Sequence, residues 1–144
     1  MRHKIIAIAL ALGGCASSTT AEPVPSGVYA ASCTVEGVRR ERGDPDEAIS
    51  YSGEGDVTIE DGAFLFVGDC RAPLVGYDGE RFDVSPTDCP IMDGTVAWTT
   101  LEIRDGYGRV TADGELEISI SVFWDRVRSG WTEEYTYACT GVRR

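Results

Sequence analysis

Apolar and polar residues alternate with a period of two over much of this chain after residue 27. The longest example is the stretch 115–124, and shorter ones span 29–36 and 134–139. In the longest stretch the apolar positions are Leu116, Ile118, Ile120, Val122 and Trp124. Successive side chains of a strand point to opposite faces, so this alternation predicts β-strands with one buried face.

Turn signals divide the chain into short segments. Five Asp-Gly steps, which favour tight hairpins, occur at Asp61-Gly62, Asp78-Gly79, Asp93-Gly94, Asp105-Gly106 and Asp113-Gly114. Between them we expect strands at 56–59, 63–67, 81–84, 96–103 and 109–112. One short helical signal is present. Asp44 suits a helix cap, Pro45 suits the first turn, and Glu47 completes a capping box.

These elements predict an all-β fold made of a single antiparallel meander. About eight strands joined by hairpins close most economically into a closed or nearly closed β-barrel, because closure removes exposed strand edges. A two-sheet β-sandwich is the alternative. We expect the domain to span 27–144, which is long enough to bury a core of its own.

The first fourteen residues have the features of a secretory signal peptide. Arg2 and Lys4 precede an apolar run at 5–12. Eight apolar residues make a helix of roughly 12 Å, whereas about 20 residues are needed to cross a bilayer core. We therefore expect the segment 1–14 to be a removed leader rather than a permanent membrane span.

Leu12-Gly13-Gly14-Cys15 resembles the lipobox of bacterial lipoproteins. This resemblance implies that the leader is cut before Cys15, that its sulfur carries diacylglycerol, and that the new amino terminus is acylated. Ala16 follows the cysteine, which in such lipoproteins implies transfer to the outer membrane. An ordinary secretory signal with a coincidental cysteine is the alternative. Residues 15–26, polar and containing two prolines, then predict a flexible tether that reaches at most about 35 Å.

The chain is strongly acidic, with 24 Asp and Glu against 13 Lys and Arg and a net charge of −11. Because the leader holds Arg2 and Lys4 but no acid, the mature protein is more acidic still. Such a charge disfavours nucleic-acid backbones and anionic lipid surfaces. It suits a basic partner protein, although acidity also serves solubility.

Four cysteines follow the lipobox, and an even number in an exported chain predicts two disulfides. Of the three possible pairings we favour Cys33 with Cys139 and Cys70 with Cys89. Cys33 and Cys139 both lie in the apolar register of their strands, at opposite ends of the domain. Zinc binding is the weaker explanation, because the spacing contains no CxxC pair and the only histidine, His3, lies in the leader.

We find no group suited to catalysis. Loss of His3 and Lys4 with the leader removes histidine bases and lysine nucleophiles. The remaining acidic clusters are Asp44, Asp46 and Glu47, and the pair Glu133 and Glu134. We interpret both as solvated faces, and adjacent strand residues point to opposite sides. The sequence therefore predicts no enzyme, no metal site and no cofactor.

Aromatic residues are the remaining candidates for a ligand site. Trp98, Trp131 and Tyr135 could line a cavity for a small apolar or sugar ligand, whereas Trp124 continues a core register. At the level of fold, residues 27–144 are similar to calycin and lipocalin-like barrels. Gly27-Val28-Tyr29 stands near their Gly-x-Trp motif, and Arg143 stands near their terminal arginine.

The sequence thus predicts a lipid-anchored, non-catalytic lipoprotein of the bacterial envelope that binds a ligand or a partner. One alternative is an acidic inhibitor of a basic hydrolase such as lysozyme. The Ser-Gly-x-x-Tyr loop of membrane-bound lysozyme inhibitors has no counterpart, because Glu54, Gly55 and Asp56 follow Ser52-Gly53. A purely structural envelope component is the other alternative.

Overall fold

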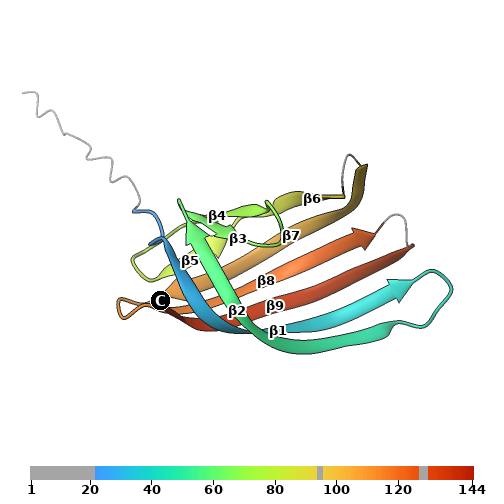
Figure 1. The fold of residues 1–144 in the computed structure, drawn as a ribbon, viewed down its shortest axis with the longest axis horizontal. Coiled ribbons are helices and arrows are strands. Elements are labelled where there is room, and N and C mark those ends of the chain that lie inside the picture. The colour runs from blue at the N-terminus through green and yellow to red at the C-terminus, as the bar shows by residue number, and fades with distance from the viewer. Residues whose placement is uncertain (1–21, 94–95, 127–129) are drawn as a thin grey trace, which may run out of the picture.

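The computed structural model describes residues 22–93, 96–126 and 130–144, without the side chains of residues 90–98. This part of the chain forms antiparallel strands (Figure 1). They are β1 (Gly27–Glu41), β2 (Glu47–Glu60), β3 (Ala63–Leu65), β4 (Arg71–Val75), β5 (Arg81–Val84), β6 (Thr87–Asp93), β7 (Val96–Val110), β8 (Glu115–Arg126) and β9 (Trp131–Arg143). Within these ranges, no helix has the length and apolar character needed to cross a bilayer.

The strands form one sheet whose pairings return to their starting point. Its order is β5-β4-β3-β2-β1-β9-β8-β7-β6, and β5 also pairs with β7. Most neighbouring strands in this ring are consecutive in the sequence and form hairpins. The two exceptions are the pairs β1 with β9 and β5 with β7. The predicted all-β antiparallel meander is therefore confirmed, and its first and last strands close the ring.

β5 and β6 together act as one interrupted strand beside β7. Arg81 lies opposite Arg109 and Thr87 lies opposite Ile103, so the same register continues from β5 into β6. Pro86 lies between the two strands and has no N–H to donate. After Pro86 the chain continues as β6, which pairs with β7 but not with β4.

The inner face of the ring holds the core. On β8 the predicted apolar register is confirmed, because each of its first four inward positions is at most 3% exposed. Tyr29 and Phe64 are the largest side chains buried beside them, at 0% and 1% exposure. This burial is the main source of stability, since each large apolar side chain removed from water contributes roughly 1.5–3 kcal/mol.

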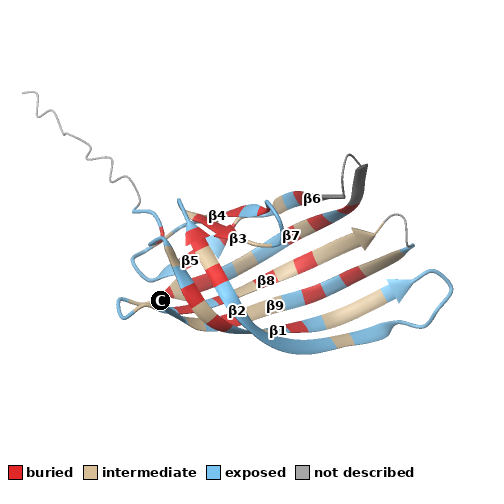
Figure 2. Ribbon diagram, viewed as in Figure 1, coloured by how far each residue is buried: buried red, intermediate tan, exposed pale blue. Residues whose placement is uncertain are grey.

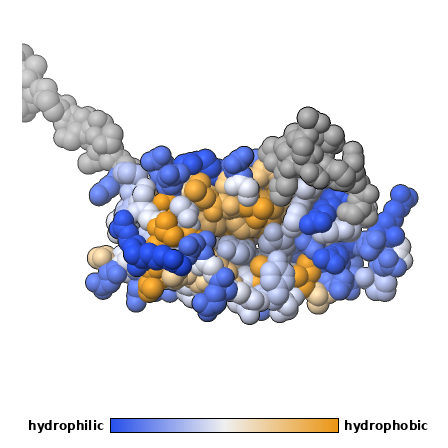
Figure 3. Space-filling view, in the orientation of Figure 1, coloured by the Kyte–Doolittle hydropathy of each residue, from blue (hydrophilic) through white to orange (hydrophobic). Residues whose placement is uncertain are grey.

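The molecule has two unlike halves. The three short strands β3, β4 and β5 complete the ring only in the half near residue 22, where buried residues gather (Figure 2). In the other half, β1, β2 and β6–β9 extend beyond them as an open sheet, and β2 is exposed there. Figure 3 shows hydrophobic residues mainly in the first half and hydrophilic residues at the far tip. We call this second half the hairpin end.

The last residues of the predicted tether belong to the folded domain. Val24 is 2% exposed and contributes to the core. Arg143 donates to the Ser26 carbonyl at 2.6 Å, and the Arg144 amide donates to the Val28 carbonyl at 2.9 Å. The residues at 22–26 and the C-terminus therefore lie at the same end of the molecule, opposite the hairpin end (Figure 1).

Three predicted Asp-Gly turns are confirmed, and one is wrong. Asp61-Gly62, Asp78-Gly79 and Asp113-Gly114 join consecutive strands, whereas Asp105-Gly106 lies inside β7. A Cβ atom on Gly106 would lie 2.6 Å from Ile120 and 2.8 Å from the Ser119 carbonyl. Glycine is therefore needed here for close strand packing beside a register shift, not for a turn. Asp93-Gly94 lies partly outside the described residues.

The expected helical turn at Asp44 to Glu47 is also wrong. Glu47 begins β2 and lies opposite Arg39, so the residues before it form the β1–β2 hairpin loop. Gly43, at φ 96°, and a hydrogen bond from the Asp44 amide to the Glu41 carbonyl shape this loop. The long ladder with β1 outweighs a capping signal that could stabilise only one turn.

Both favoured disulfides are present. Cys33 on β1 and Cys139 on β9 are direct cross-strand partners and are joined to each other. Cys70 is joined to Cys89, which ties the loop between β3 and β4 to β6. The first bond links β1 and β9, the first and last strands of the chain. The second crosses the side of the molecule where β4 and β6 are not paired with each other.

Candidate functional site

The inner face of the hairpin end carries an aromatic–arginine cluster, made of Arg39, Trp124, Arg126, Trp131 and Glu133. Its members come from three neighbouring strands, β1, β8 and β9. All of them lie in the inward register, because Trp124 is directly opposite Glu133, which is opposite Arg39. The cluster therefore lies where the core ends and the sheet opens.

An ion pair at this cluster joins two strands that are distant in sequence. Arg39 donates from Nε and Nη2 to Glu133 Oε1, at 2.9 and 2.7 Å. Glu133 is 7% exposed, whereas Glu47 lies 3.6 Å from Arg39 and is open to solvent. The hydrogen bond to Glu133 raises the pKa of the Arg39 guanidinium, so this charge is permanent.

Guanidinium groups lie over both tryptophan rings. The Arg126 guanidinium is 4.2 Å from the Trp124 ring centre and 4.4 Å from that of Trp131, and Arg39 is 4.7 Å from Trp131. The Trp124 indole also donates to the Thr99 hydroxyl on β7. Cation–π contacts of this kind are worth about 0.5–2 kcal/mol each. The cluster thus acts first as a rigid junction between strands.

The outer face of the same strands carries a separate ion network. Glu134 is paired with Arg40 and with Arg104, both at 3.1 Å. Arg40 also lies 3.3 Å from Asp46, and Arg104 lies 3.8 Å from Glu102. Of the acidic residues considered above, Asp46, Glu47, Glu133 and Glu134 have arginine partners. Glu133 and Glu134 point to opposite faces of β9, as expected for neighbouring strand residues. Within the described ranges, no group of three His, Cys, Asp or Glu residues could hold a metal ion.

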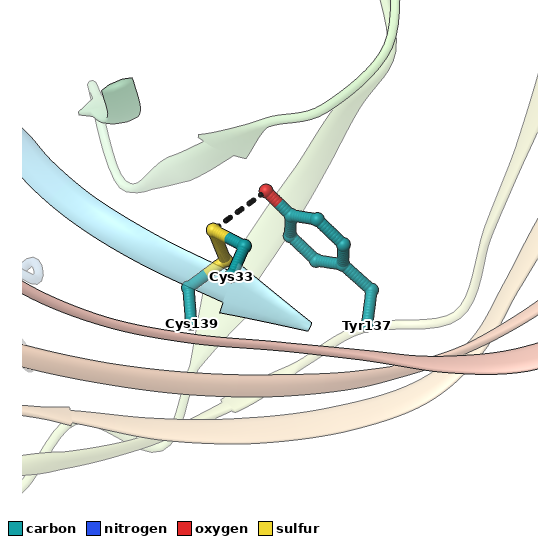
Figure 4. The surroundings of a disulfide bond; sticks show 3 residues. All are labelled: Cys33, Tyr137 and Cys139. Atoms are coloured by element: carbon teal, nitrogen blue, oxygen red, sulfur yellow. Dashed lines mark hydrogen bonds between the residues drawn. A yellow bond between two sulfur atoms is a disulfide. The ribbon is translucent and has the colours of Figure 1, made fainter. Parts of the chain in front are cut away.

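The half-buried phenol of Tyr137 lies beside the Cys33–Cys139 bond. The Tyr137 hydroxyl donates to Cys33 Sγ at 3.2 Å, as Figure 4 shows. Phe66, from the loop after β3, contacts the Tyr137 ring edge-on at 5.2 Å. Burial, with nearby Tyr51 second, raises the pKa of Tyr137, and burial raises that of Tyr135 more strongly. Both phenols therefore stay neutral at physiological pH.

The structure describes the side chains of two of the three predicted ligand residues, and both lie on the inward face of β9. Trp131 is half-buried in the aromatic–arginine cluster, and Tyr135 is 7% exposed on the same face of β9. The side chain of Trp98 lies outside the described residues, as does the whole of Cys15. Trp131 and Tyr135 pack within the hairpin end, and their assignment as ligand contacts stays a prediction.

A shallow groove of about 590 Å³ follows the outer face of β1, β9, β8 and β7. Its floor is made of small side chains, namely Ser32, Thr34, Ser119, Ala138 and Thr140. Arg109 donates to both carboxylate oxygens of Glu117 at its rim, at 2.8 Å each, and this lowers the pKa of Glu117. Exposed Tyr107 lies on β7 beside Arg109 and lines the same side of the groove. The sequence signal for this groove is the series of small side chains that alternate with core positions on β1, β8 and β9.

The second feature that the sequence did not reveal is the free edge of β2. From residue 47 to 57 this strand pairs with β1 on one side, and no other described strand pairs with its opposite side. Tyr51 is 61% exposed there. We call this stretch the β2 edge. The sequence signal for a strand here is the alternation of Ile49 and Tyr51 with small residues. Gly53 and Gly55 take the next two positions of the same register, so the apolar pattern stops there.

Comparisons with known proteins leave the function open. No protein-family model matches this chain, and no curated protein matches it significantly. Among solved structures, it is similar to the ywiB protein from Bacillus subtilis, at 11% sequence identity and a TM-score of 0.36. The alignment covers 79% of this chain and 92% of that one. We draw no functional conclusion from a likeness at this level.

Proposed function

We propose that this protein is a lipid-anchored, non-catalytic binding module of the bacterial envelope, which recognises a partner protein through its hairpin end. The observation that carries the proposal is the exposed β2 edge at the end opposite residue 22. A chain anchored through its N-terminus would present this edge away from the membrane. The two disulfides also suit an oxidising compartment outside the cytoplasm.

The anchor part of the proposal rests on the lipobox ending at Cys15. A residue with several acyl chains gives a stable membrane attachment, whereas one chain binds only reversibly. The linker between Cys15 and the folded residues that begin at Glu22 is short, so the domain would stay near its membrane. An outer-membrane location follows from Ala16 in the same resemblance.

An acidic inhibitor of a basic hydrolase is the second candidate. Favouring it, β2 contains Glu47, Glu54, Asp56 and Glu60 and no basic residue. Complementary charge accelerates association with a cationic enzyme and makes it sensitive to salt. Both candidate functions involve a basic partner protein. They differ in whether binding inhibits the catalytic activity of that partner.

The anchor is tested by fractionating bacteria that express the full chain. We expect the protein in the outer-membrane fraction, with an acylated N-terminal peptide that begins at Cys15 in mass spectra. A Cys15→Ala variant should lose the acyl mass and the membrane attachment. Protein found in the cytosol with an intact leader and reduced thiols would contradict the anchor.

The binding part is tested by crosslinking in intact cells followed by purification of the anchored protein. We expect a basic protein that is released by raised salt. If that protein is a hydrolase whose activity falls on addition of the purified chain, the inhibitor function holds. Recovery of a sugar or lipid and no partner protein would refute protein binding in favour of a small-ligand module.

A further inference from the structure

We propose that the β2 edge accepts an extended segment of a basic partner protein, which adds to the sheet as a new strand beside β2. The segment would alternate apolar and basic residues. This inference rests on the proposed function as a protein-binding module and names the surface and the partner chemistry. Strand addition to an exposed sheet edge is a general mode of peptide recognition.

Backbone groups provide the first argument. Successive residues of a strand present their N–H and C=O groups alternately to the two neighbouring strands. Along residues 47–57 the pairing partners on one side all come from β1, and the described chain supplies no strand on the other side. The edge extends for roughly 30 Å at the usual rise per residue. It contains no proline or lysine, two residues that usually protect such edges.

The inner face provides room for side chains of the added strand. Ile49, Tyr51, Gly53 and Gly55 point inward, since their partners on β1 lie in the inward register. No heavy atom lies within 4 Å of a Cβ atom built on Gly53 or Gly55. Apolar side chains on one face of the segment would fill this space and cover the exposed Tyr51 ring.

The outer face selects the charge of the partner. Ser50, Ser52, Glu54 and Asp56 point outward and are exposed. Asp56 lies 2.7 Å from Arg144, whereas none of the ion pairs among the described residues includes Glu54. Lysine or arginine side chains on the second face of the segment would lie beside these carboxylates, and cross-strand pairs of opposite charge are favourable.

Charge also disfavours a second copy of this chain as the occupant. Each β2 edge brings Glu47, Glu54 and Asp56 and no base, and each chain has a net charge of −11. Two such edges side by side would repel, because like charges on neighbouring strands destabilise pairing. The negative electrostatic field of this edge attracts a basic segment and repels a second copy of the chain.

The test measures amide hydrogen exchange in the full chain, purified in a non-ionic detergent. The probe is a synthetic capped peptide of alternating lysine and valine. We expect it to slow exchange at residues 47–57 by on the order of tenfold, because strand pairing protects amides that were open to water. The same peptide with glutamate in place of lysine should not protect them, and neither should a version with every backbone amide N-methylated.

A charge-reversal variant with a matched control, together with one space-filling variant, locates the site. Glu54→Arg should weaken peptide binding roughly two- to fivefold, the range expected for an exposed charge contact. Glu115→Arg makes the same charge change on an exposed residue of β8, away from the edge, and should bind as the parent does. Gly53→Val, which fills the inner space, should also reduce binding while the chain keeps its unfolding midpoint.

The outcomes separate this inference from the proposed function. Protection without selectivity for charge, equal binding by the N-methylated peptide, or a peptide-free dimer with a protected β2 edge would each overturn the strand-addition inference. If co-purification still returns a basic partner in those cases, the binding module stands and uses another surface. If the peptide binds as expected but no envelope partner is found, the proposed function fails while the edge remains competent.

Discussion

Gly37 on β1 lies directly opposite Tyr135 on β9, and a Cβ atom on Gly37 would lie 2.5 Å from both the Cα and the Cβ of Tyr135. The same Cβ would also collide with the Glu134 carbonyl oxygen. These are backbone contacts, which cannot rotate away. The approach of β1 to β9 at the base of the hairpin end therefore depends on the absence of a side chain.

Gly37→Ala should destabilise the protein by roughly 1–3 kcal/mol, the usual cost of forcing extra atoms into a packed site. Gly53→Ala on the neighbouring strand is the control, because a Cβ there meets no heavy atom within 4 Å. It should leave stability unchanged or raise it slightly, since alanine reduces the entropy of the unfolded chain. Urea midpoints of the two variants provide the comparison, and equal midpoints would refute the packing argument.

Glu133→Gln should lower the thermal midpoint much more than Glu134→Gln. Glu133 is 7% exposed and accepts two hydrogen bonds from Arg39, whereas the Glu134 side chain is 46% exposed in its pairs with arginines. The change at Glu133 weakens two charge-assisted hydrogen bonds to a buried carboxylate, whereas fully exposed pairs contribute little. Calorimetry on both variants tests this, and a larger loss for Glu134→Gln would contradict it.

Stability should fall at alkaline pH as the buried phenols ionise. The pKa of Tyr135 and that of Tyr137 are raised above the ordinary value of 10.0, chiefly by burial. The neutral phenol is therefore favoured in the folded state. This contribution is complete below the unfolded pKa near 10 and is lost as pH rises above it.

Unfolding midpoints measured in urea between pH 7 and pH 11 check this expectation. Tyr135→Phe should flatten the decline above pH 10, because phenylalanine cannot ionise. Tyr107→Phe, at a side chain that is 68% exposed, should keep the parent slope. An unchanged slope in Tyr135→Phe would show that other groups cause the alkaline loss.

Removal of the two disulfides should have unequal costs. The Cys33–Cys139 bond spans 106 residues and the Cys70–Cys89 bond spans 19. In the chain-entropy description, loops of these sizes correspond to roughly 4.7 and 3 kcal/mol of stabilisation. The double variant Cys33→Ala with Cys139→Ala should therefore unfold at lower guanidinium concentration than Cys70→Ala with Cys89→Ala. The reverse order would mean that local closure beside β6 matters more than linking the terminal strands.

Several features of the fold were predictable because they depend on neighbouring residues. Alternation along 115–124 identified the buried face of β8, and Asp-Gly steps located three of the hairpin turns. The pairing of Cys33 with Cys139 followed from their common register. Features that depend on distant contacts were missed, such as β4 and β6, whose short sequences lack clear alternation.

The candidate sites divide in the same way. Trp131 and Tyr135 were recognisable as aromatic residues of a terminal strand, but Arg39 and Glu133 are 94 residues apart and nothing local links them. The strand predicted at 56–59 covers only the second half of β2, because Gly53 and Gly55 interrupt the apolar pattern of the first half. Its identity as a strand comes from the ladder with β1, not from its own propensity.

The sequence by itself determined which face of each strong strand is buried and how acidic the chain is, and it predicts lipid attachment at Cys15. Only the tertiary structure decided that β5 closes the ring against β7, that arginines cover the tryptophans, and that no described strand other than β1 pairs with residues 47–57 of β2. The physical reason is that side-chain direction along a strand is a local property with a period of two. Which strand lies alongside another depends on register and loop closure across the whole chain.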